Sequence, residues 1–501
     1  MGPAVVVVGS GAAGLAAALA AKSRGADVTV VEATPTLGGS TALSSGAVWL
    51  PNNAIPGTRA YLNSVAVGDV NENLVECFID AAPRITEWLG EMTALRWKPL
   101  PFPDCHSELP GGVNGGRSLE PQPVQITEDI ASLLRPGLPW RPRATLTELM
   151  SGISPEILHE RGRTGVVVGG QALVGALLTA ATAARVRVRT SARATTLLHS
   201  GSAVTGVQID GEALPGTVIL ASGGFERDTA LAKTFLGAPV RGLIGAPGAR
   251  GDGLRMAMAA GAALGTMFEA WWCPTISVPG ERFDGAQAYR MLLFERARPG
   301  SLMVDRHGRR FTNEAQSYHE VGRALRSFDR VPAWLVFDAE HRRTYPVGPL
   351  PPGSPDPGWL RRGNSLTELA ANIRLPPSVL AETVERFNRA AADGTDPYYG
   401  RGNFAYDRAM GDPRAAHPTL RPLDEPPYYA IEVHAGVGGT KGGPRTDTDG
   451  RVLRPDGQPI PGLFAAGNAA ASPFGLAYPG IGGTLGPALV FGVLAGWAAA
   501  A

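Results

Sequence analysis

The sequence predicts an α/β protein, in which a parallel sheet is covered by helices and a second, α+β domain is inserted. Three observations predict this fold: a strand–glycine turn–helix–strand unit opens the chain, later strands run into small residues, and the composition changes between them. The 501 residues are 44% hydrophobic and 18% charged, which excludes a disordered chain. The length alone suggests about three units of 150 residues, and the element pattern reduces this number to two.

The first element is the apolar run Ala4–Val8, typical of a strand that is buried on both faces. The turn GSGAAG follows, an alanine-rich helix extends to about Arg24, and a second strand, Asp27–Val31, leads to Glu32. The GxGxxG glycines permit a tight turn, a close approach of a pyrophosphate and close helix–strand packing, while the acid accepts hydrogen bonds from a ribose. The unit predicts a Rossmann-like, dinucleotide-binding domain; a purely structural turn is the alternative.

The segment after Glu32 favours FAD over NAD. Gly38-Gly39-Ser40-Thr41 and the small residues up to Trp49 allow the chain to run against a flat, extended cofactor, and an NAD domain needs no such segment there. An ordinary coil is the alternative. Gly39 is followed directly by Ser40 and Thr41, with no histidine at this point to form a covalent link to the flavin. We therefore expect the FAD to be non-covalent. The predicted cofactor-binding residues are Gly9, Ser10, Gly11, Ala12, Ala13, Gly14, Glu32, Ala33, Gly39, Ser40, Thr41, Ser44, Gly46, Ala47, Ala221, Ser222, Gly223, Gly467, Asn468, Gly483, Thr484 and Leu485.

Later elements fit the same scheme. Strands are predicted at 186–189, 204–209, 218–225 and 462–468, and the last two deliver small residues to a ligand. Between about 270 and 437 the chain becomes rich in Pro, Arg and aromatic residues, with a helix at 378–391. We therefore expect residues 1–269 and 438–501 to form the FAD-binding domain and residues 270–437 to form the inserted catalytic domain.

Charge and cysteine content exclude several functions. The net charge of +1 gives no reason to expect a nucleic-acid partner. Three cysteines without CxxC spacing argue against a disulfide framework or a metal site, and we expect a reducing, cytoplasmic location. The uncharged stretch 485–501 is interrupted by glycines and a proline, which predicts a buried helix and no integral membrane segment; peripheral membrane association stays open. Arginine far exceeds lysine, as in GC-rich, actinobacterial-like genomes.

Motifs along nearly the whole chain resemble the 3-ketosteroid Δ1-dehydrogenases, a branch of the succinate dehydrogenase/fumarate reductase flavoprotein superfamily. The matching segments are GSGAAG with VVE, GGSTALSSGAVWLP, FPDCH with GRSLEP, GGQALVGALL, ASGGFE, GDGLRMAMAAGAALG, WWCP, GRRFTNEAQSYHE, GGTKGGPRTD and GLFAAGNAAASPFGLAYPGIGGTLGPALVFG. The resemblance implies a GR2-type, fumarate-reductase-like FAD-binding domain with an inserted substrate domain. It also implies desaturation of a cyclic, steroid-like ketone beside its carbonyl.

The resemblance also assigns catalytic roles. Tyr478 and the backbone N–H of Gly482 match the family's donors to the ketone oxygen, and Tyr318 matches the tyrosine that takes the α-proton. A hydride then leaves the adjacent carbon for flavin N5. Donors to the oxygen are needed because charge develops there as the proton leaves. A tyrosine base needs a lowered pKa or a stabilised phenolate.

One position departs from the family pattern. The family carries a further tyrosine in its FPDY segment, where this chain has Cys105 followed by His106. Three interpretations stay open: Tyr318 acts alone, His106 replaces the lost partner, or the pocket is reshaped for a different ketone. Cys105 and His106 are therefore auxiliary candidates.

The sequence thus predicts an FAD-dependent dehydrogenase that acts on CH–CH groups of a small hydrophobic ketone. A quinone or O₂ would serve as the external electron acceptor. Two alternatives stay open: an ene-reductase of the fumarate reductase type, and a non-catalytic protein that binds FAD and a hydrophobic ligand.

Overall fold

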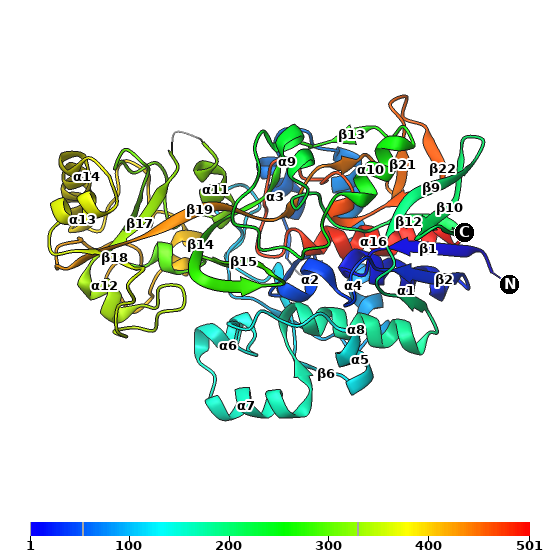
Figure 1. The fold of residues 1–501 in the computed structure, drawn as a ribbon, viewed down its shortest axis with the longest axis horizontal. Helices are drawn as coiled ribbons and strands as arrows, with labels where there is room; N and C mark the ends of the chain where they lie inside the picture. Colours follow the sequence, from blue (N-terminus) through cyan, green and yellow to red (C-terminus); the bar gives the residue numbers. More distant parts are fainter. Residues whose placement is uncertain (1, 53–54, 328–329) are drawn as a thin grey trace.

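Two six-stranded sheets organise the chain, and they lie in different halves of an elongated molecule (Figure 1). The structure, a computed structural model, describes residues 2–52, 55–327 and 330–501. The first sheet has the order β21-β22-β12-β1-β2-β8, and its strands are parallel except for the edge strand β21. These strands are β1 (Ala4–Val8), β2 (Asp27–Val31), β8 (Arg187–Arg189), β12 (Thr217–Leu220), β21 (Arg451–Leu453) and β22 (Pro459–Ala465).

The predicted opening unit is confirmed. β1 and β2 have the predicted bounds and flank α1 (Ala12–Ser23). Four of the five residues of each strand are buried, as expected of a sheet covered on both faces. The strand predicted at 218–225 is shorter in the structure: β12 covers Thr217–Leu220, and the small residues after it form an irregular segment.

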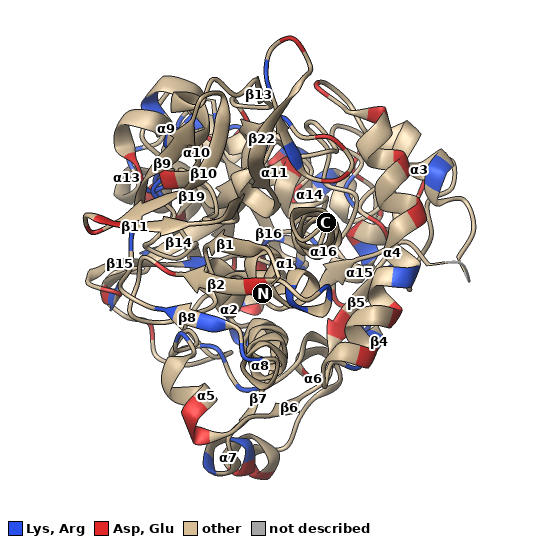
Figure 2. Ribbon diagram, turned by 90° about the vertical axis from the view of Figure 1, so that its right-hand side faces the viewer, with Lys and Arg blue, Asp and Glu red and all other residues tan. Residues whose placement is uncertain are grey.

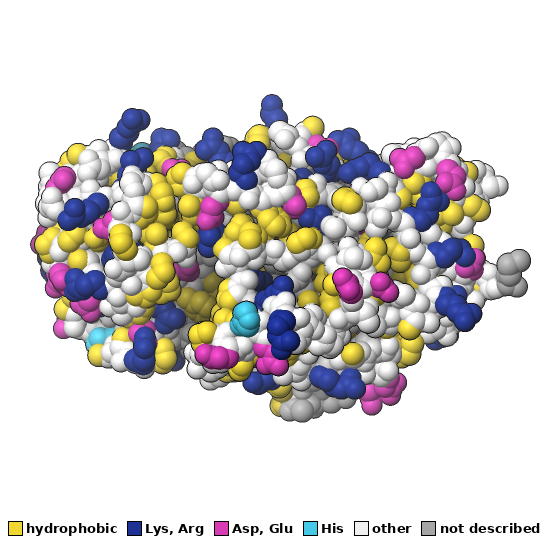
Figure 3. Space-filling model, turned by 60° about the horizontal axis from the view of Figure 1, so that its bottom comes forward, with side chains coloured by type: hydrophobic (Ala, Val, Ile, Leu, Met, Phe, Trp, Pro, Cys, Tyr) yellow, Lys and Arg dark blue, Asp and Glu magenta, His cyan; other side chains and the backbone are white. Residues whose placement is uncertain are grey.

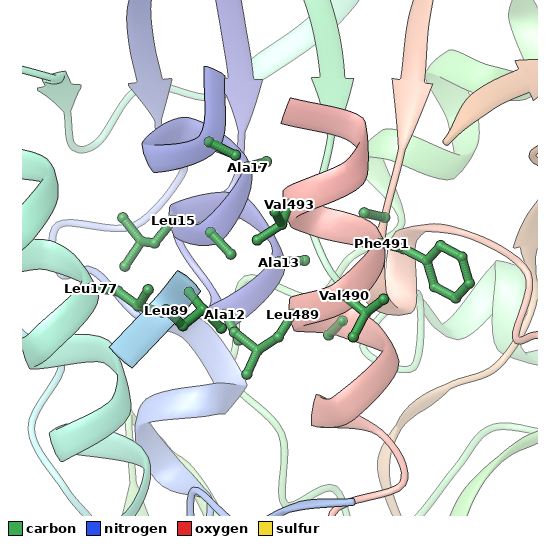
Figure 4. Packing of buried hydrophobic residues seen from close by; sticks show 14 of the residues in the cluster. Ala12, Ala13, Leu15, Ala17, Leu89, Leu177, Leu489, Val490, Phe491 and Val493 are labelled. Carbon is green, nitrogen blue, oxygen red and sulfur yellow. The ribbon is translucent and has the colours of Figure 1, made fainter. Parts of the chain in front are cut away.

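Helix α16 (Leu485–Ala499) confirms the buried helix predicted at the end of the chain. It packs against α1, and α1 in turn packs against α8 (Gly169–Ala183) (Figure 4). Alanine and glycine line the α1–α16 contact, so the two backbones approach closely. Leu489, Val490 and Val493 of α16 join the same cluster, as do residues of α4 (Glu72–Met92). Among the described residues, no helix is long and apolar enough to cross a membrane.

The second sheet is antiparallel, with the order β15-β14-β19-β17-β16 and with β18 paired to β19. The long strands β14 and β19 run from the middle of the molecule into this half (Figure 1). Its strands are β14 (Ala270–Phe283), β15 (Ala286–Met291), β16 (Ser301–Val304), β17 (Ala333–Phe337), β18 (Arg361–Gly363) and β19 (Tyr428–Thr440). Its helices include α11 (Tyr318–Leu325), α12 (Ala339–Thr344), α13 (Leu366–Asn372), α14 (Pro377–Ala391) and α15 (Ala405–Met410).

Smaller elements surround the first sheet. A meander of β9 (Ala194–Ser200), β10 (Ala203–Ile209) and β11 (Glu212–Pro215) lies beside it, and a three-stranded sheet joins β3 (Val48–Trp49), β5 (Ser118–Pro121) and β4 (Trp97–Pro99). Both chain ends lie on the face that Figure 2 turns toward the viewer, where charged residues lie on the outer helices α4 and α7 (Pro155–Thr164). The division into domains stays a prediction; the boundary proposed at residue 437 falls inside β19.

Candidate active site

The predicted cofactor residues gather at one edge of the parallel sheet. The carboxyl ends of β1, β2, β12 and β22 meet there, which is the edge where open α/β sheets bind ligands. The groups are Gly9–Gly14 after β1, Glu32 and Ala33 after β2, Ala221–Gly223 after β12, and Gly467 and Asn468 after β22. The others lie in or after α2 (Gly39–Leu43) or at the start of α16: Gly39, Ser40, Thr41, Ser44, Gly46, Ala47, Gly483, Thr484 and Leu485.

Hydrogen bonds tie these segments together. Ser10 Oγ donates to Glu32 Oε2 at 2.6 Å and accepts from Gly38 N at 3.0 Å. Ala12 N donates to Thr41 Oγ1 at 3.1 Å, so α2 is fixed beside the first turn of α1. The carboxylate of Glu32 is therefore buried and oriented after β2, where a ribose would lie in a dinucleotide-binding fold.

The same edge fits FAD in shape and in its donor groups. Gly11, the N-cap residue of α1, has no side chain to cap the helix, although Ala12 N donates to Thr41 Oγ1. N–H groups at a helix N-terminus favour phosphate. Side-chain atoms added at Gly39 would meet nothing within 4 Å, so there is open space beside this backbone.

Some predicted cofactor side chains have structural partners. Ser222 Oγ accepts from Gly253 N at 3.2 Å at the start of α10 (Asp252–Ala259). Asn468 Oδ1 accepts from Trp271 Nε1 at 2.9 Å. These two side chains order the walls of the site, and their direct role toward FAD stays a prediction.

The two predicted catalytic tyrosines lie together although they are 160 residues apart. Tyr318 Oη donates a hydrogen bond to Tyr478 Oη, and their ring centroids are 5.2 Å apart. Gly482 N also donates to Tyr478 Oη, at 3.1 Å. Tyr478 Oη thus accepts two hydrogen bonds, which leaves its own proton free to be donated to a third group.

Burial makes both phenols weak acids. The pKa of Tyr318 lies well above its ordinary value, because burial penalises the phenolate and the neighbouring Tyr478 adds to the effect. Burial also raises the pKa of Tyr478, although the hydrogen bonds from Tyr318 and Gly482 oppose that shift. The lowered pKa expected of a tyrosine base is therefore not what this structure provides, and the hydrogen-bonded pair must be considered as a unit.

The loop that carries Tyr478 is fixed against β3. Trp49 N donates to Gly482 O at 3.0 Å. Gly482 has a φ of +94°, and a Cβ there would lie 2.5 Å from Val48 Cα. No larger residue fits at this position, so the N–H that faces Tyr478 is held by backbone packing.

A buried lysine joins the segments that carry the two tyrosines. Lys441 Nζ donates to Leu476 O and Ala477 O, each at 2.8 Å, just before Tyr478. The ring Nε2 of His319, the residue after Tyr318, lies 3.0 Å from the same Leu476 O. The pKa of Lys441 falls to about 7, because burial disfavours the ammonium ion. The sequence analysis did not predict this set of contacts, because Lys441, His319 and the segment before Tyr478 are far apart along the chain.

Cys105 and His106 have different surroundings. The Cys105 backbone N–H donates to Pro479 O at 3.0 Å, so the thiol lies beside the tyrosine loop. Burial raises the pKa of this thiol to about 12, which makes it a poor nucleophile. The His106 ring is partly exposed, with Nδ1 3.5 Å from Glu108 Oε1, and among the described residues no hydrogen bond joins it to Tyr318. The geometry therefore disfavours His106 as a substitute partner.

One further residue near the tyrosines, Tyr406, was missed in the sequence analysis. Tyr406 packs in one apolar cluster with Cys105 and Tyr478. Asn313 Nδ2 donates to Asp407 Oδ2 at 2.9 Å, which joins the segment before Tyr318 to α15. A tyrosine in an unremarkable helix gives no local signal of this role. Among the described residues, no group of three His, Cys, Asp or Glu side chains is placed to hold a metal ion.

A recess opens near the middle of the face drawn in Figure 3, and hydrophobic side chains gather around it. The apolar cluster at the tyrosines contains residues from both halves of the chain, and its buried members are Ala47, Leu100, Phe102, Cys105, Leu146, Trp271, Ala297, Ala315, Tyr406, Met410, Tyr478 and Ile481. Two phenols and a backbone N–H in an apolar setting suit a neutral ring with one carbonyl oxygen.

Fold and site together define a flavoprotein with FAD as its cofactor: residues 4–485 match the family model for the FAD binding domain. The chain is 39% identical to the 4-oxocyclohexanecarboxylate 2-dehydrogenase of Sinomonas cyclohexanicum, covering 98% of this chain and 92% of the relative. It is 37% identical to the 3-oxosteroid 1-dehydrogenase of Mycobacterium tuberculosis strain H37Rv, with coverages of 98% and 97%. The chain therefore belongs to the 3-ketosteroid Δ1-dehydrogenase family, as the motifs indicated.

A solved structure agrees with this membership. The 3-ketosteroid Δ1-dehydrogenase of Sterolibacterium denitrificans, in complex with 1,4-androstadiene-3,17-dione, superposes with a TM-score of 0.92 at 35% identity. The match covers 99% of each chain. The predicted fold class and the FAD cofactor are thereby confirmed, and family membership favours a dehydrogenase over the two alternatives.

Proposed function

We propose that this protein removes two hydrogens from adjacent carbons of a ring ketone, beside the carbonyl, and produces the α,β-unsaturated ketone. The observation that carries the proposal is the Tyr318–Tyr478–Gly482 arrangement, in which two hydroxyls and one N–H converge in an apolar setting. FAD, when bound, accepts the hydride that leaves the β-carbon. The residues of the chain must therefore acidify the α-carbon and hold the ring in place.

Tyr478 and Gly482 stabilise the ketone oxygen. Because Tyr478 Oη already accepts two hydrogen bonds, its own proton is free to be donated to the substrate oxygen. The N–H of Gly482 donates to this hydroxyl and polarises it, which makes Tyr478 a stronger donor to the ketone oxygen. One preorganised donor of this kind typically contributes about 2.7–4 kcal/mol to a developing oxyanion.

Tyr318 takes the α-proton without first becoming a phenolate. As the ketone oxygen takes the proton of Tyr478, the proton of Tyr318 moves to Tyr478 Oη, and Tyr318 Oη takes the proton from the α-carbon. Both tyrosines end neutral and the substrate becomes its enol. This relay suits two buried phenols whose pKa values are raised. When the β-hydride leaves, the enol proton is released through the same pair.

A quinone or O₂ is proposed as the external electron acceptor. The protein itself is proposed to be cytoplasmic. The substrate is proposed to be a cyclic ketone, and two substrate classes follow from the names of the relatives. The M. tuberculosis relative is named for a 3-oxosteroid and the Sinomonas relative for 4-oxocyclohexanecarboxylate. The shared requirement is a ring carbonyl with a hydrogen on one α-carbon and another on the β-carbon next to it.

The test is anaerobic mixing of the FAD-loaded protein with ring ketones, such as 4-androstene-3,17-dione, and with the matching ring alcohols. We expect ketones to bleach the oxidised flavin band and to yield a product two mass units lighter. The alcohols lack the carbonyl and should not react. A flavin band that is perturbed but not bleached by any ring ketone would instead indicate a binding protein.

A further inference from the structure

One of the most deeply buried arginines lacks a counter-ion. Arg117, Arg296 and Arg401 are all 0% exposed. Arg117 pairs with Asp104 at 2.5 Å and Arg401 with Glu314 at 3.2 Å. Within the described part of the chain, no carboxylate forms an ion pair with Arg296. Since a guanidinium stays charged in proteins and a buried unpaired charge is costly, this site calls for a negative partner.

The guanidinium of Arg296 is partly held by carbonyl groups. Its Nε donates to Leu292 O at 3.2 Å, and its Nη1 donates to Gln316 O at 2.8 Å and to Glu314 O. Its Nη2 is buried and has no hydrogen-bond partner among the described residues. These contacts fix the side chain beside the segment that leads into Tyr318, with one N–H group left over.

A second donor without a strong acceptor lies beside it. The Tyr406 hydroxyl is buried and faces the Cys105 thiol, which is only a weak acceptor. Burial raises the pKa of Tyr406 well above its ordinary value, Cys105 adds to this rise, and the positive charge of Arg296 opposes it. Tyr406 therefore lies within electrostatic reach of both residues. Buried polar groups in folded proteins are normally hydrogen-bonded, so two neighbouring donors that lack a strong acceptor require an explanation.

These donors lie at the wall of the pocket proposed for the ring ketone. Tyr406, Cys105 and Tyr478 belong to one apolar cluster, and Ala297, the neighbour of Arg296, belongs to it as well. Tyr318 packs against the same cluster. At position 105 the thiol takes much less volume than the phenol expected from the family motif. The departure from that motif thus falls next to these two donors.

We infer that the substrate is a cyclic ketone that carries a carboxylate, which binds Arg296 Nη2 and Tyr406 Oη while the ketone oxygen binds Tyr478. The inference rests on the proposed function and specifies its substrate class. A carboxylate supplies both the acceptors and the negative charge that the site lacks, whereas a water molecule would supply acceptors only. Asp407 and Glu295 act on Arg296 electrostatically, but neither forms an ion pair with it, and Asp407 already accepts from Asn313.

Matched substrates test the inference on the FAD-loaded protein. The probes are 4-oxocyclohexanecarboxylate, its uncharged methyl ester and 4-androstene-3,17-dione, each mixed anaerobically while flavin bleaching is followed. We expect the second-order rate constant of bleaching to be at least about 100-fold larger for the acid than for the ester, the size of one charge-assisted contact.

The outcomes separate the two claims. Equal or faster bleaching by the ester or the steroid would overturn the carboxylate site and would leave the proposed ketone desaturation standing. No bleaching by any of the three ketones would overturn the proposed function and the inference with it.

Two variants locate the site. Tyr406→Phe should lower the bleaching rate constant for the acid at least about 10-fold more than for the ester, because it removes one donor to the carboxylate. Cys105→Tyr should lower the acid-to-ester ratio as well, because the larger side chain would crowd Tyr406 in the same cluster. Tyr345→Phe is the matched control, since Tyr345 binds Asp412 at 3.0 Å and takes no part in the cluster. If Tyr406→Phe slows acid and ester by the same factor, Tyr406 does not bind a carboxylate.

Discussion

The two halves of the molecule are stabilised in different ways. In the cofactor half, α16 carries no charged residue, and Gly492 and Gly496 lie directly on α1: a Cβ at Gly492 would be 2.6 Å from Ala13 O. Behind the tyrosines, Glu314 is fully buried between Arg310 at 2.7 Å and Arg401 at 3.2 Å. The α1–α16 contact depends on backbone proximity, whereas the segment behind the tyrosines depends on charge pairing. Different substitutions should therefore destabilise the two regions.

The largest effect is expected where backbones touch. Gly492→Val places two methyl groups against the carbonyl of Ala13, and helix backbones in the core cannot move apart without exposing apolar surface. We expect little folded, FAD-containing protein, measured as FAD per chain and melting temperature. Gly90→Ala in α4 is the control, since its Cβ would meet nothing within 4 Å. Normal FAD content in Gly492→Val would refute the role given to this contact.

Loss of a buried carboxylate should be the next largest effect. Glu314→Gln keeps the volume but leaves Arg310 and Arg401 without the charge that they share. Breaking a buried pair typically costs about 3–5 kcal/mol, and chemical denaturation would measure the loss. Glu212→Gln is the matched surface control, because Glu212 pairs with Arg189 in an exposed position. Equal stability of the two variants would contradict the contrast between the halves.

Removal of the Tyr478 hydroxyl should slow catalysis without lowering the stability of either half of the molecule. Tyr478→Phe is expected to lower the rate of flavin reduction by about 10²–10³-fold, the usual effect of one lost donor at a developing oxyanion. FAD content and melting temperature should stay close to those of the wild type, because only one hydroxyl is removed. A reduction rate within a few fold of the wild type would exclude Tyr478 as the donor to the ketone.

A pH-dependent effect on stability is expected through Lys441. Its pKa is lowered to about 7 in the folded protein, while the unfolded chain has the ordinary lysine value. Between these two pKa values the unfolded state binds more protons, so stability should rise as pH increases from about 7 toward 10. Lys441→Met should remove this part of the rise, measured by melting temperature across pH. An identical pH dependence in the two proteins would show that Lys441 stays charged.

The sequence predicts those parts of the molecule that depend on neighbouring residues. The unit from β1 to β2 was predicted because its turn, helix and acid lie within 32 residues and each has a local pattern. The pairing of Tyr318 with Tyr478 was implied by family motifs, whereas its raised pKa was not, because burial comes from distant segments.

Other parts of the site have no local pattern at all. Arg296, Tyr406 and Lys441 acquire their roles only when segments far apart in the chain meet. Nothing near these residues in the sequence marks them as different from other arginines, tyrosines or lysines. Their roles follow from tertiary burial, which residue spacing does not encode.

The central claim is that Tyr318 and Tyr478 act together to form the enol of a ring ketone. It is tested most directly by anaerobic stopped-flow reduction of the FAD-loaded Tyr318→Phe variant with a ketone that reduces the wild type. We predict that flavin bleaching slows by at least about 100-fold, as expected for loss of a general acid–base group, while the flavin stays bound. Bleaching at the wild-type rate, with the same enone as product, would contradict the account.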